Sequence, residues 1–329
     1  MGLFDKFRKK KTEDTVNEVT QQNKKAVSAS TEPGEEDFVK GSGFYKAGKN
    51  EEAAECFIKS AEKGNFSAQH NCAVMYMNGV GVEKDEEKAF YWFSKTAERG
   101  HTEDQMKLAL IYYTGKGTQK DPEKAFFWMK KSAESGNSYA QYYLSLFYKD
   151  GYATDEDEHK ALEWSEKAAE QGHIKAQAYC AEVYDDYFGP AYDEEKSLFW
   201  CLKAAEQGDA VSQLRCGKKY RFGEGVEQNH IEAHKWFLKA AEQDNTEAQF
   251  WCGCIYNFGD GIKKDLEKAF YWHKKAAEKD HSISQEYLAN MYLNGFGTNK
   301  DRKKAKYWYE KAANNGRTDA QRALKSIKF

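Results

Sequence analysis

One tryptophan recurs along the chain at a constant interval, and this spacing restricts the fold more than any other feature. Successive members lie 36 residues apart (for example, 128 − 92 = 36): Trp92, Trp128, Trp164, Trp200, Trp236, Trp272 and Trp308. Two further columns keep the same period, a glutamine column that starts at Gln69 and a tyrosine column that starts at Tyr76. A fixed period of this length predicts an array of stacked units, each packed on its neighbours.

Each unit carries the signals of a helical hairpin. In the first full unit, Ala68, Cys72 and Tyr76 recur at i, i+4 and i+8 and form one apolar stripe of a helix. Gly79 follows at the point where a left-handed residue ends a helix. Asp85 then stands where a carboxylate caps the first turn of a second helix. The pattern predicts an all-α fold, an α/α solenoid built as a right-handed superhelix of helix hairpins.

The period also divides the chain. We expect residues 1–35 to be a disordered tail because they are polar and rich in Ser, Thr, Lys and Glu. Residues 36–65 resemble a shortened tetratricopeptide-like hairpin and are interpreted as a capping unit. Seven full repeats follow over 66–317, and residues 318–329 are expected to form a last capping helix.

One unit departs from the pattern more than the others. Its hairpin connection contains Gly189 and Pro190 instead of a Gly-x-Gly pair, and Ser197 stands in a column that is otherwise alanine. We therefore expect an irregular loop there. A separate column of small residues predicts that the two helices of each hairpin approach closely, and it comprises Ala73, Ala109, Ser145, Ala181, Gly217, Gly253 and Ala289.

The repeat resembles a known family, the Sel1-like repeat, a relative of the tetratricopeptide repeat. The shared string runs Gln-x-x-Leu-x-x-x-Tyr-x-x-Gly-x-Gly-Val-x-x-Asp-x-x-Lys-Ala-x-x-Trp-x-x-Lys-Ala-Ala-x-x-Gly, and residues 268–277 match it almost fully. The resemblance implies a superhelix that serves as a scaffold or adaptor for protein complexes. Some secreted bacterial members carry paired cysteines in every repeat and have been linked to β-lactam binding. That cysteine pattern is missing here, so this activity is not expected.

Composition excludes several classes of function. The formal net charge is −3, whereas nucleic-acid binders usually show a basic excess. No stretch of about 18 apolar residues could span a membrane, and the basic N-terminus lacks the apolar core of a secretory signal. We expect a cytoplasmic protein. Peripheral membrane contact through Leu3, Phe4 and Phe7 is an alternative, although three apolar residues are a small anchor.

The sequence predicts no catalytic residue, no cofactor and no metal. The cysteines are odd in number, seven, and four of them share a column with leucine, so we expect buried free thiols. His230 and His234 have the spacing of a zinc pair, but Ile231 occupies the place of the glutamate in the metalloprotease motif. His101 falls in a turn column, where a capping role accounts for it. The Gly-x-Gly pairs follow no strand, so they are interpreted as turns.

The remaining candidate for function is the surface of the first helices. In the related tetratricopeptide hairpin these helices line the concave side, so the resemblance implies a partner-binding groove. The columns assigned to the groove change from apolar to charged along the chain, whereas structural columns stay constant. The residues expected to bind a partner are Met77, Met106, Leu110, Tyr113, Tyr139, Tyr142, Leu146, Lys175, Glu182, Asp185, Lys218 and Arg221.

The leading hypothesis is therefore a non-catalytic adaptor that binds a protein or peptide in this groove. A second hypothesis is an enzyme or small-ligand binder with a pocket between repeats. A third, an RNA-binding array that reads one base per repeat, is disfavoured by a sequence pI of about 6.3. The alternative interpretation of the groove columns is that they vary because nothing selects them.

Overall fold

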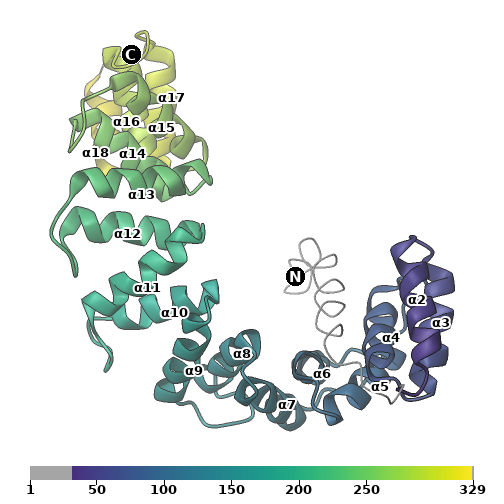
Figure 1. Cartoon of the computed structure of the whole chain (residues 1–329). Coiled ribbons are helices and arrows are strands. Elements are labelled where there is room, and N and C mark those ends of the chain that lie inside the picture. Colours follow the sequence, from purple (N-terminus) through teal and green to yellow (C-terminus); the bar gives the residue numbers. More distant parts are fainter. Residues whose placement is uncertain (1–31, 328–329) are drawn as a thin grey trace. The chain divides into compact units, whose positions relative to one another are not determined.

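The computed structural model describes residues 32–327, and every regular element in that range is a helix. The helices are α2 (Glu35–Lys46), α3 (Asn50–Glu62), α4 (Phe66–Asn78), α5 (Glu86–Glu98), α6 (Thr102–Thr114), α7 (Pro122–Glu134), α8 (Ser138–Lys149), α9 (Glu158–Glu170), α10 (Ile174–Asp185), α11 (Glu194–Glu206), α12 (Ala210–Phe222), α13 (His230–Glu242), α14 (Thr246–Phe258), α15 (Leu266–Glu278), α16 (Ser282–Asn294), α17 (Arg302–Asn314) and α18 (Thr318–Ser326). Figure 1 shows them as successive hairpins. The predicted all-α repeat fold is confirmed.

The chain divides into two compact units. The first comprises the residues up to Asp104 together with Lys116–Gln119, and the second comprises Gln105–Gly115 and the residues from Lys120 onward. Within each unit, the extensive packing joins helices that follow one another in the chain, as in α2–α3–α4–α5 and in α7 to α18. This nearest-neighbour packing is the arrangement that a repeat array requires.

The predictions for the two ends of the chain fall partly on residues that the structure describes and partly outside them. Residues 1–31, which include Leu3, Phe4 and Phe7, lie outside it, so the expected tail and its membrane contact stay predictions. The hairpin expected over 36–65 is formed by α2 and α3, and α18 begins at Thr318. No helix in the described part of the chain combines the length and hydrophobicity of a bilayer-spanning segment.

The aspartate and tyrosine columns together fix the start of each second helix. Asp85 accepts a hydrogen bond from the backbone N–H of Lys88 at 2.9 Å and caps α5 as predicted. The backbone N–H of Asp85 donates to the carbonyl of Tyr76 at 3.0 Å. Lys88 then places its ammonium 5.2 Å from the centroid of the Tyr76 ring. The same contacts recur around Asp301, Tyr292 and Lys304, which explains why these residue types keep the period.

The two glycines of a Gly-x-Gly pair have different roles. Gly295 ends α16 with φ 76°, the left-handed conformation that was predicted. Gly297 also has a positive φ, but in addition a Cβ there would lie 1.9 Å from the carbonyl oxygen of Leu266. The second glycine therefore lets the loop of one repeat touch the first turn of the preceding second helix, a contact that the sequence did not reveal.

The glutamine column joins consecutive repeats. The side-chain amide of Gln177 donates to the carbonyl of Ala169 near the end of the preceding helix, at 3.0 Å. Its oxygen accepts a hydrogen bond of 2.7 Å from Gln207, 30 residues further on, and Gln207 also donates to the carbonyl of Gly172. Gln177 thus adds a side-chain hydrogen bond to a helix-end carbonyl and links it to Gln207 of the next repeat.

Small residues let the helices of a hairpin approach closely, as predicted. Gly217 lies under the ring of Phe237, and a Cβ added to it would be 2.6 Å from that ring. Gly253 lies in the same way under His273. Where both positions hold serine, Ser165 donates to Ser145 at 2.8 Å. Close packing therefore depends on matched pairs across each hairpin.

The tryptophan column is less uniformly buried than the sequence suggests. Trp200, Trp236 and Trp272 are buried, with 7–8 % of their surface exposed. Trp164 is only partly buried, and Lys167 covers its open side with the ammonium 4.1 Å from the ring centroid. Trp92, Trp128 and Trp308 are also partly buried. These four tryptophans therefore pack at the edge of the core, where part of each side chain stays open.

Candidate functional site

All twelve predicted partner-binding residues lie on first helices of the hairpins. Met77 is on α4, in the first compact unit. The others belong to the second unit and are distributed over α6, α8, α10 and α12. We refer to the surface of these four helices within the second unit as the first-helix face. The candidate residues on this face change from apolar to charged along the chain.

The apolar part of this face contains an exposed aromatic group. Tyr113 has 43 % of its surface exposed. Its ring stacks on Phe147, with centroids 5.7 Å apart, and meets the edge of Tyr152 at 4.9 Å. Leu110 and Leu146 are partly buried against the same core. Tyr113 is therefore held in place by its neighbours while one side of the ring faces solvent.

A second aromatic group lies one repeat further along. The rings of Tyr139 and Tyr142 each have their centroid 4.8 Å from that of His173. His173 Nδ1 accepts the backbone N–H of Ala176 at 3.2 Å, which is the capping role expected for this column. Burial, with help from the charge of Lys175, lowers the pKa of His173 to about 4. The imidazole is thus neutral near pH 7 and forms part of an aromatic surface.

Two of the predicted residues are less open than expected. Met106 is buried, with 9 % of its surface exposed, and it belongs to the core between α6 and α9. Tyr142 is half-buried and packs against the next core cluster, and burial raises the pKa of its hydroxyl. Column position predicts the helices on which these residues lie, but side-chain packing determines which residues a partner could reach.

The charged part of the face is largely paired within the chain. Lys218 Nζ lies 2.6 Å from Glu247, and Arg221 pairs with Asp260. Arg221 also stacks on Trp251, with its guanidinium carbon 5.1 Å from the ring centroid. Lys175 and Glu182 are exposed, and Glu182 also lies 3.9 Å from Arg215. They are therefore the more accessible charges for a partner.

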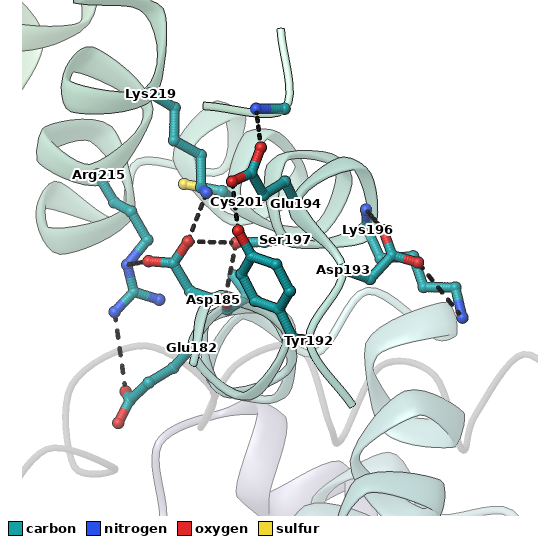
Figure 2. A network of polar contacts seen from close by, with 12 residues as sticks. Glu182, Asp185, Tyr192, Asp193, Glu194, Lys196, Ser197, Cys201, Arg215 and Lys219 are labelled. Carbon is teal, nitrogen blue, oxygen red and sulfur yellow. Dashed lines mark hydrogen bonds and ion pairs between the residues drawn. The ribbon is translucent and has the colours of Figure 1, made fainter. Parts of the chain in front are cut away.

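Asp185, Ser197 and Lys219 form a polar network between three helices (Figure 2). Lys219 is buried, with 1 % of its surface exposed, and its ammonium donates to Asp185 Oδ1. Ser197 donates to the same carboxylate oxygen at 3.1 Å and to the carbonyl of Ala181 at 2.9 Å. Arg215 lies 4.0 Å from the other oxygen of Asp185. The network thus links α10, α11 and α12.

The network rests on residues that depart from the repeat pattern. Ser197 replaces alanine, as noted above, and Lys219 occupies a column that is otherwise apolar: Met75, Ile111, Phe147, Val183, Ile255 and Met291. A buried ammonium is costly unless it is paired, and Asp185 supplies the counter-charge. Both departures therefore contact the same carboxylate, that of Asp185.

The irregular loop predicted beside this network is confirmed. Helix α10 ends at Asp185, and Asp186 is extended instead of left-handed. Tyr187 and Phe188 are exposed, with 70 % and 92 % of their surfaces open. Glu194 secures the far side of the loop by accepting hydrogen bonds from the Tyr192 hydroxyl and the Gly225 backbone N–H (Figure 2).

The candidates for metal or redox chemistry considered in the sequence have structural contacts. His230 Nδ1 lies 2.8 Å from Asp260, whereas the His234 ring packs on the edge of Tyr256. All seven cysteines are buried thiols in the structure, and the sulfurs of Cys201 and Cys216 are 2.9 Å apart.

An open hollow of about 580 Å³ lies at the start of α15. Lysine and acidic side chains line most of it, together with Tyr256 and Gly297, and it contains none of the predicted binding residues. It offers no histidine, cysteine or serine to a substrate. The hollow therefore gives the second hypothesis, a pocket between repeats, little chemical support.

Reasoning from the sequence missed two buried charges, Lys219 and Asp104. Each stands in a column that is apolar or small in the other repeats, so comparison of columns could have identified both. The same comparison would not have identified their partners, which lie 34 residues away: Asp185 for Lys219 and His70 for Asp104.

Comparison with known proteins agrees with this architecture. The model of the Sel1 repeat matches residues 40–65, 66–101, 102–137, 138–173, 174–209, 210–245, 246–281 and 282–316. A protective antigen of uropathogenic Escherichia coli with an SLR fold is similar, at 31% identity and a TM-score of 0.84, over 95% of this chain and 67% of that one. A Sel1 repeat protein from Oxalobacter formigenes is also similar, at 31% identity and a TM-score of 0.66, over 95% and 90% of the two chains. A search of curated proteins found no match.

Proposed function

The chain belongs to the Sel1 repeat family, and from that premise we propose that it is a non-catalytic adaptor that binds a protein or peptide on its first-helix face. Sel1 repeat proteins are generally scaffolds for protein interactions. The observation that carries the proposal is Tyr113, an aromatic side chain that is 43 % exposed yet fixed by stacking on Phe147 and Tyr152. Rigid aromatic anchors of this kind are typical of binding hot spots.

The chemistry of the face favours one kind of partner. The aromatic side chains of Tyr113, Tyr139 and Tyr142 suit an aliphatic or aromatic anchor. The exposed charges of Lys175 and Glu182 follow on α10, where they would set orientation and association rate more than affinity. We therefore expect a peptide segment with an apolar stretch followed by charged residues of both signs.

The test begins with affinity capture from native cells and identification of the partner by mass spectrometry. Binding of the purified partner is then measured by calorimetry. We expect Tyr113→Ala combined with Tyr139→Ala to weaken binding by more than ~1 kcal/mol, because both rings lie on first helices and aromatic anchors dominate binding energy. Lys175→Glu should mainly slow association and change its salt dependence.

The chain offers a matched control on its second helices. Phe127 and Phe199 are also half-exposed aromatics, at 55 % and 51 %, and each packs on the adjacent tryptophan. Phe127→Ala combined with Phe199→Ala removes a similar aromatic area from the opposite helices of the hairpins. If this control abolishes binding while the first-helix variant does not, the partner lies on the second helices and the proposal is wrong.

A further inference from the structure

Asp104 is a buried carboxylate in a column that otherwise holds only alanine or serine. The equivalent positions are Ala68, Ala140, Ala176, Ser212, Ala248, Ser284 and Ala320. None of the surface of the Asp104 side chain is exposed. No lysine or arginine pairs with this side chain among the described contacts; its polar neighbours are two histidines and a threonine. Since a buried carboxylate needs strong partners, the arrangement requires an explanation.

The three neighbours converge on the carboxylate from different elements. His70 on α4 places Nδ1 2.9 Å from Oδ1, and His101 before α6 places Nδ1 3.0 Å from Oδ2. Thr96 on α5 donates to Oδ2 at 2.6 Å. The two imidazole rings are 4.8 Å apart, and one ligand atom from each of His70, His101 and Asp104 lies within 4.8 Å of the others. All four residues belong to the first compact unit.

The position of His101 Nδ1 shows that hydrogen bonds alone leave a conflict. This nitrogen lies 3.3 Å from the backbone N–H of Asp104, a donor, and 3.0 Å from the carboxylate of the same residue, an acceptor. An imidazole nitrogen either donates or accepts, so one of these two contacts is unfavourable in any protonation state. At the equivalent His173, Nδ1 faces the backbone N–H of Ala176 without a carboxylate beside it, because residue 176 is alanine.

We propose that His70, His101 and Asp104 form a binding site for a divalent transition-metal ion such as Zn²⁺. Two imidazole nitrogens and one carboxylate oxygen are the donors that zinc and its neighbours in the first transition row prefer over Mg²⁺ or Ca²⁺. Bonds of about 2.0–2.1 Å in a tetrahedral site separate ligand atoms by about 3.3 Å. The two nitrogen–oxygen separations of 2.9 and 3.0 Å need to open by a few tenths of an ångström, and the three ligand atoms lie within 4.8 Å of one another.

The surroundings fit such a site. The Thr96 hydroxyl holds one carboxylate oxygen from outside, as hydrogen-bonding partners commonly do for metal ligands. The side chains of His70 and His101 are 17 % and 28 % exposed, so water can reach the site and fill the fourth coordination position of the ion. The ion would replace the imidazole protons and join α4 to the start of α6. His101 would give up its cap hydrogen bond with the backbone N–H of Asp104.

The test uses Zn²⁺ alone with the reduced full-length chain, followed by native mass spectrometry and calorimetry. We expect one ion per chain, and binding at least ~100-fold weaker in Asp104→Ala and in His70→Leu. Both replacements are residues that the same columns carry elsewhere, at Ala140 and Leu214, so both variants should fold. The control is His173→Ala, which removes a cap histidine without a carboxylate beside it and should leave binding unchanged.

Cobalt distinguishes this site from the cysteines. Co²⁺ bound to nitrogen and oxygen gives d–d bands without the charge-transfer band of a thiolate ligand, and we expect that spectrum. A thiolate band, zinc binding of equal strength in the two site variants, or no zinc bound at a tenfold excess over protein would each overturn the proposal.

Discussion

Two repeats place a charge where the others have a small or apolar residue, and they stabilise it differently. Lys219 meets a full counter-charge, because Asp185 accepts its hydrogen bond directly. Asp104 instead meets two imidazoles and the hydroxyl of Thr96. The first arrangement pairs the charge within the chain, whereas the second gathers two imidazole nitrogens and a hydroxyl around one carboxylate. The comparison teaches that a departure from the repeat is structural when a full counter-charge pairs with it, whereas a departure surrounded by groups that can ligate an ion is the basis for proposing a site.

The largest effect is expected when the pair around Lys219 is broken. Asp185→Ala leaves an ammonium that is 1 % exposed without its counter-charge, which should destabilise the protein by about 3–5 kcal/mol. Partial solvent access to Asp185 places the effect toward the lower end of that range. The shift of the denaturation midpoint in urea measures it.

A second substitution separates the effect of the buried charge on stability from the effect of packing. Lys219→Met restores the residue that the column carries at Met75 and Met291, and alone it should change stability by less than about 1 kcal/mol. Adding it to Asp185→Ala should recover most of the loss. If the double variant is as unstable as Asp185→Ala alone, the network is not held by the buried charge.

A third buried ionisable side chain, His273, sharpens the comparison because its ring nitrogens have no hydrogen-bond partner among the described residues. The ring stacks on Tyr287 with centroids 4.6 Å apart. Burial, followed by the charge of His281, lowers the pKa of His273 from 6.5 to about 3. This histidine therefore behaves as an aromatic core residue that is neutral in the folded protein.

The lowered pKa predicts an acid-dependent loss of stability. Below pH 6.5 the unfolded chain binds a proton that folded His273 does not, so the free energy of unfolding should decrease as the pH falls toward about 3. The slope is ~1.4 kcal/mol per pH unit. The measurement is the melting temperature between pH 7 and pH 5.

His273→Phe provides the control, because Phe237 fills the equivalent place over Gly217 in the preceding hairpin. This variant should fold and should lose less stability on acidification than the wild-type chain. Parallel pH profiles of the two proteins would show that other groups cause the acid sensitivity.

Of the two aspartate substitutions, the smaller effect on stability is expected at Asp104. Asp104→Ala removes a buried charge. The polar groups that remain are two imidazoles and a hydroxyl, and all of them can be neutral. Loss of the hydrogen bonds destabilises the folded protein, whereas removal of the carboxylate also removes the cost of burying its charge. Since these effects oppose each other, we expect the free energy of unfolding to change by about 1–2 kcal/mol or less. Urea denaturation in the presence of EDTA measures this effect apart from any bound ion. A loss as large as that of Asp185→Ala would mean that Asp104 is a structural residue of the same kind.

Local signals in the sequence were enough to predict the repeat architecture. The period, the aspartate caps and the glycine stops each act within a few residues, so Asp85, Gly79 and their equivalents could be assigned without a structure. The same holds for the irregular loop after Asp185, because the missing glycine pair is visible in the sequence. The helices that carry the candidate binding residues could be assigned for the same reason.

The contacts between repeats required the tertiary structure. His70 reaches Asp104 and Asp185 reaches Lys219 across 34 residues, from one first helix toward the next. An offset slightly shorter than the period depends on how far successive hairpins rotate and on which rotamers fit between them. Met106 is another example, since its column suggested an open groove and its neighbours bury it.

The sequence by itself therefore determined the fold, the repeat boundaries and the helix ends, because those depend on interactions between residues close in the chain. Only the tertiary structure decided which of the variable side chains are paired, buried or open to a ligand. The physical reason is that a charge such as Asp104 or Lys219 is stabilised by whatever lies within about 3 Å of it, and in a stacked array those atoms belong to a different repeat.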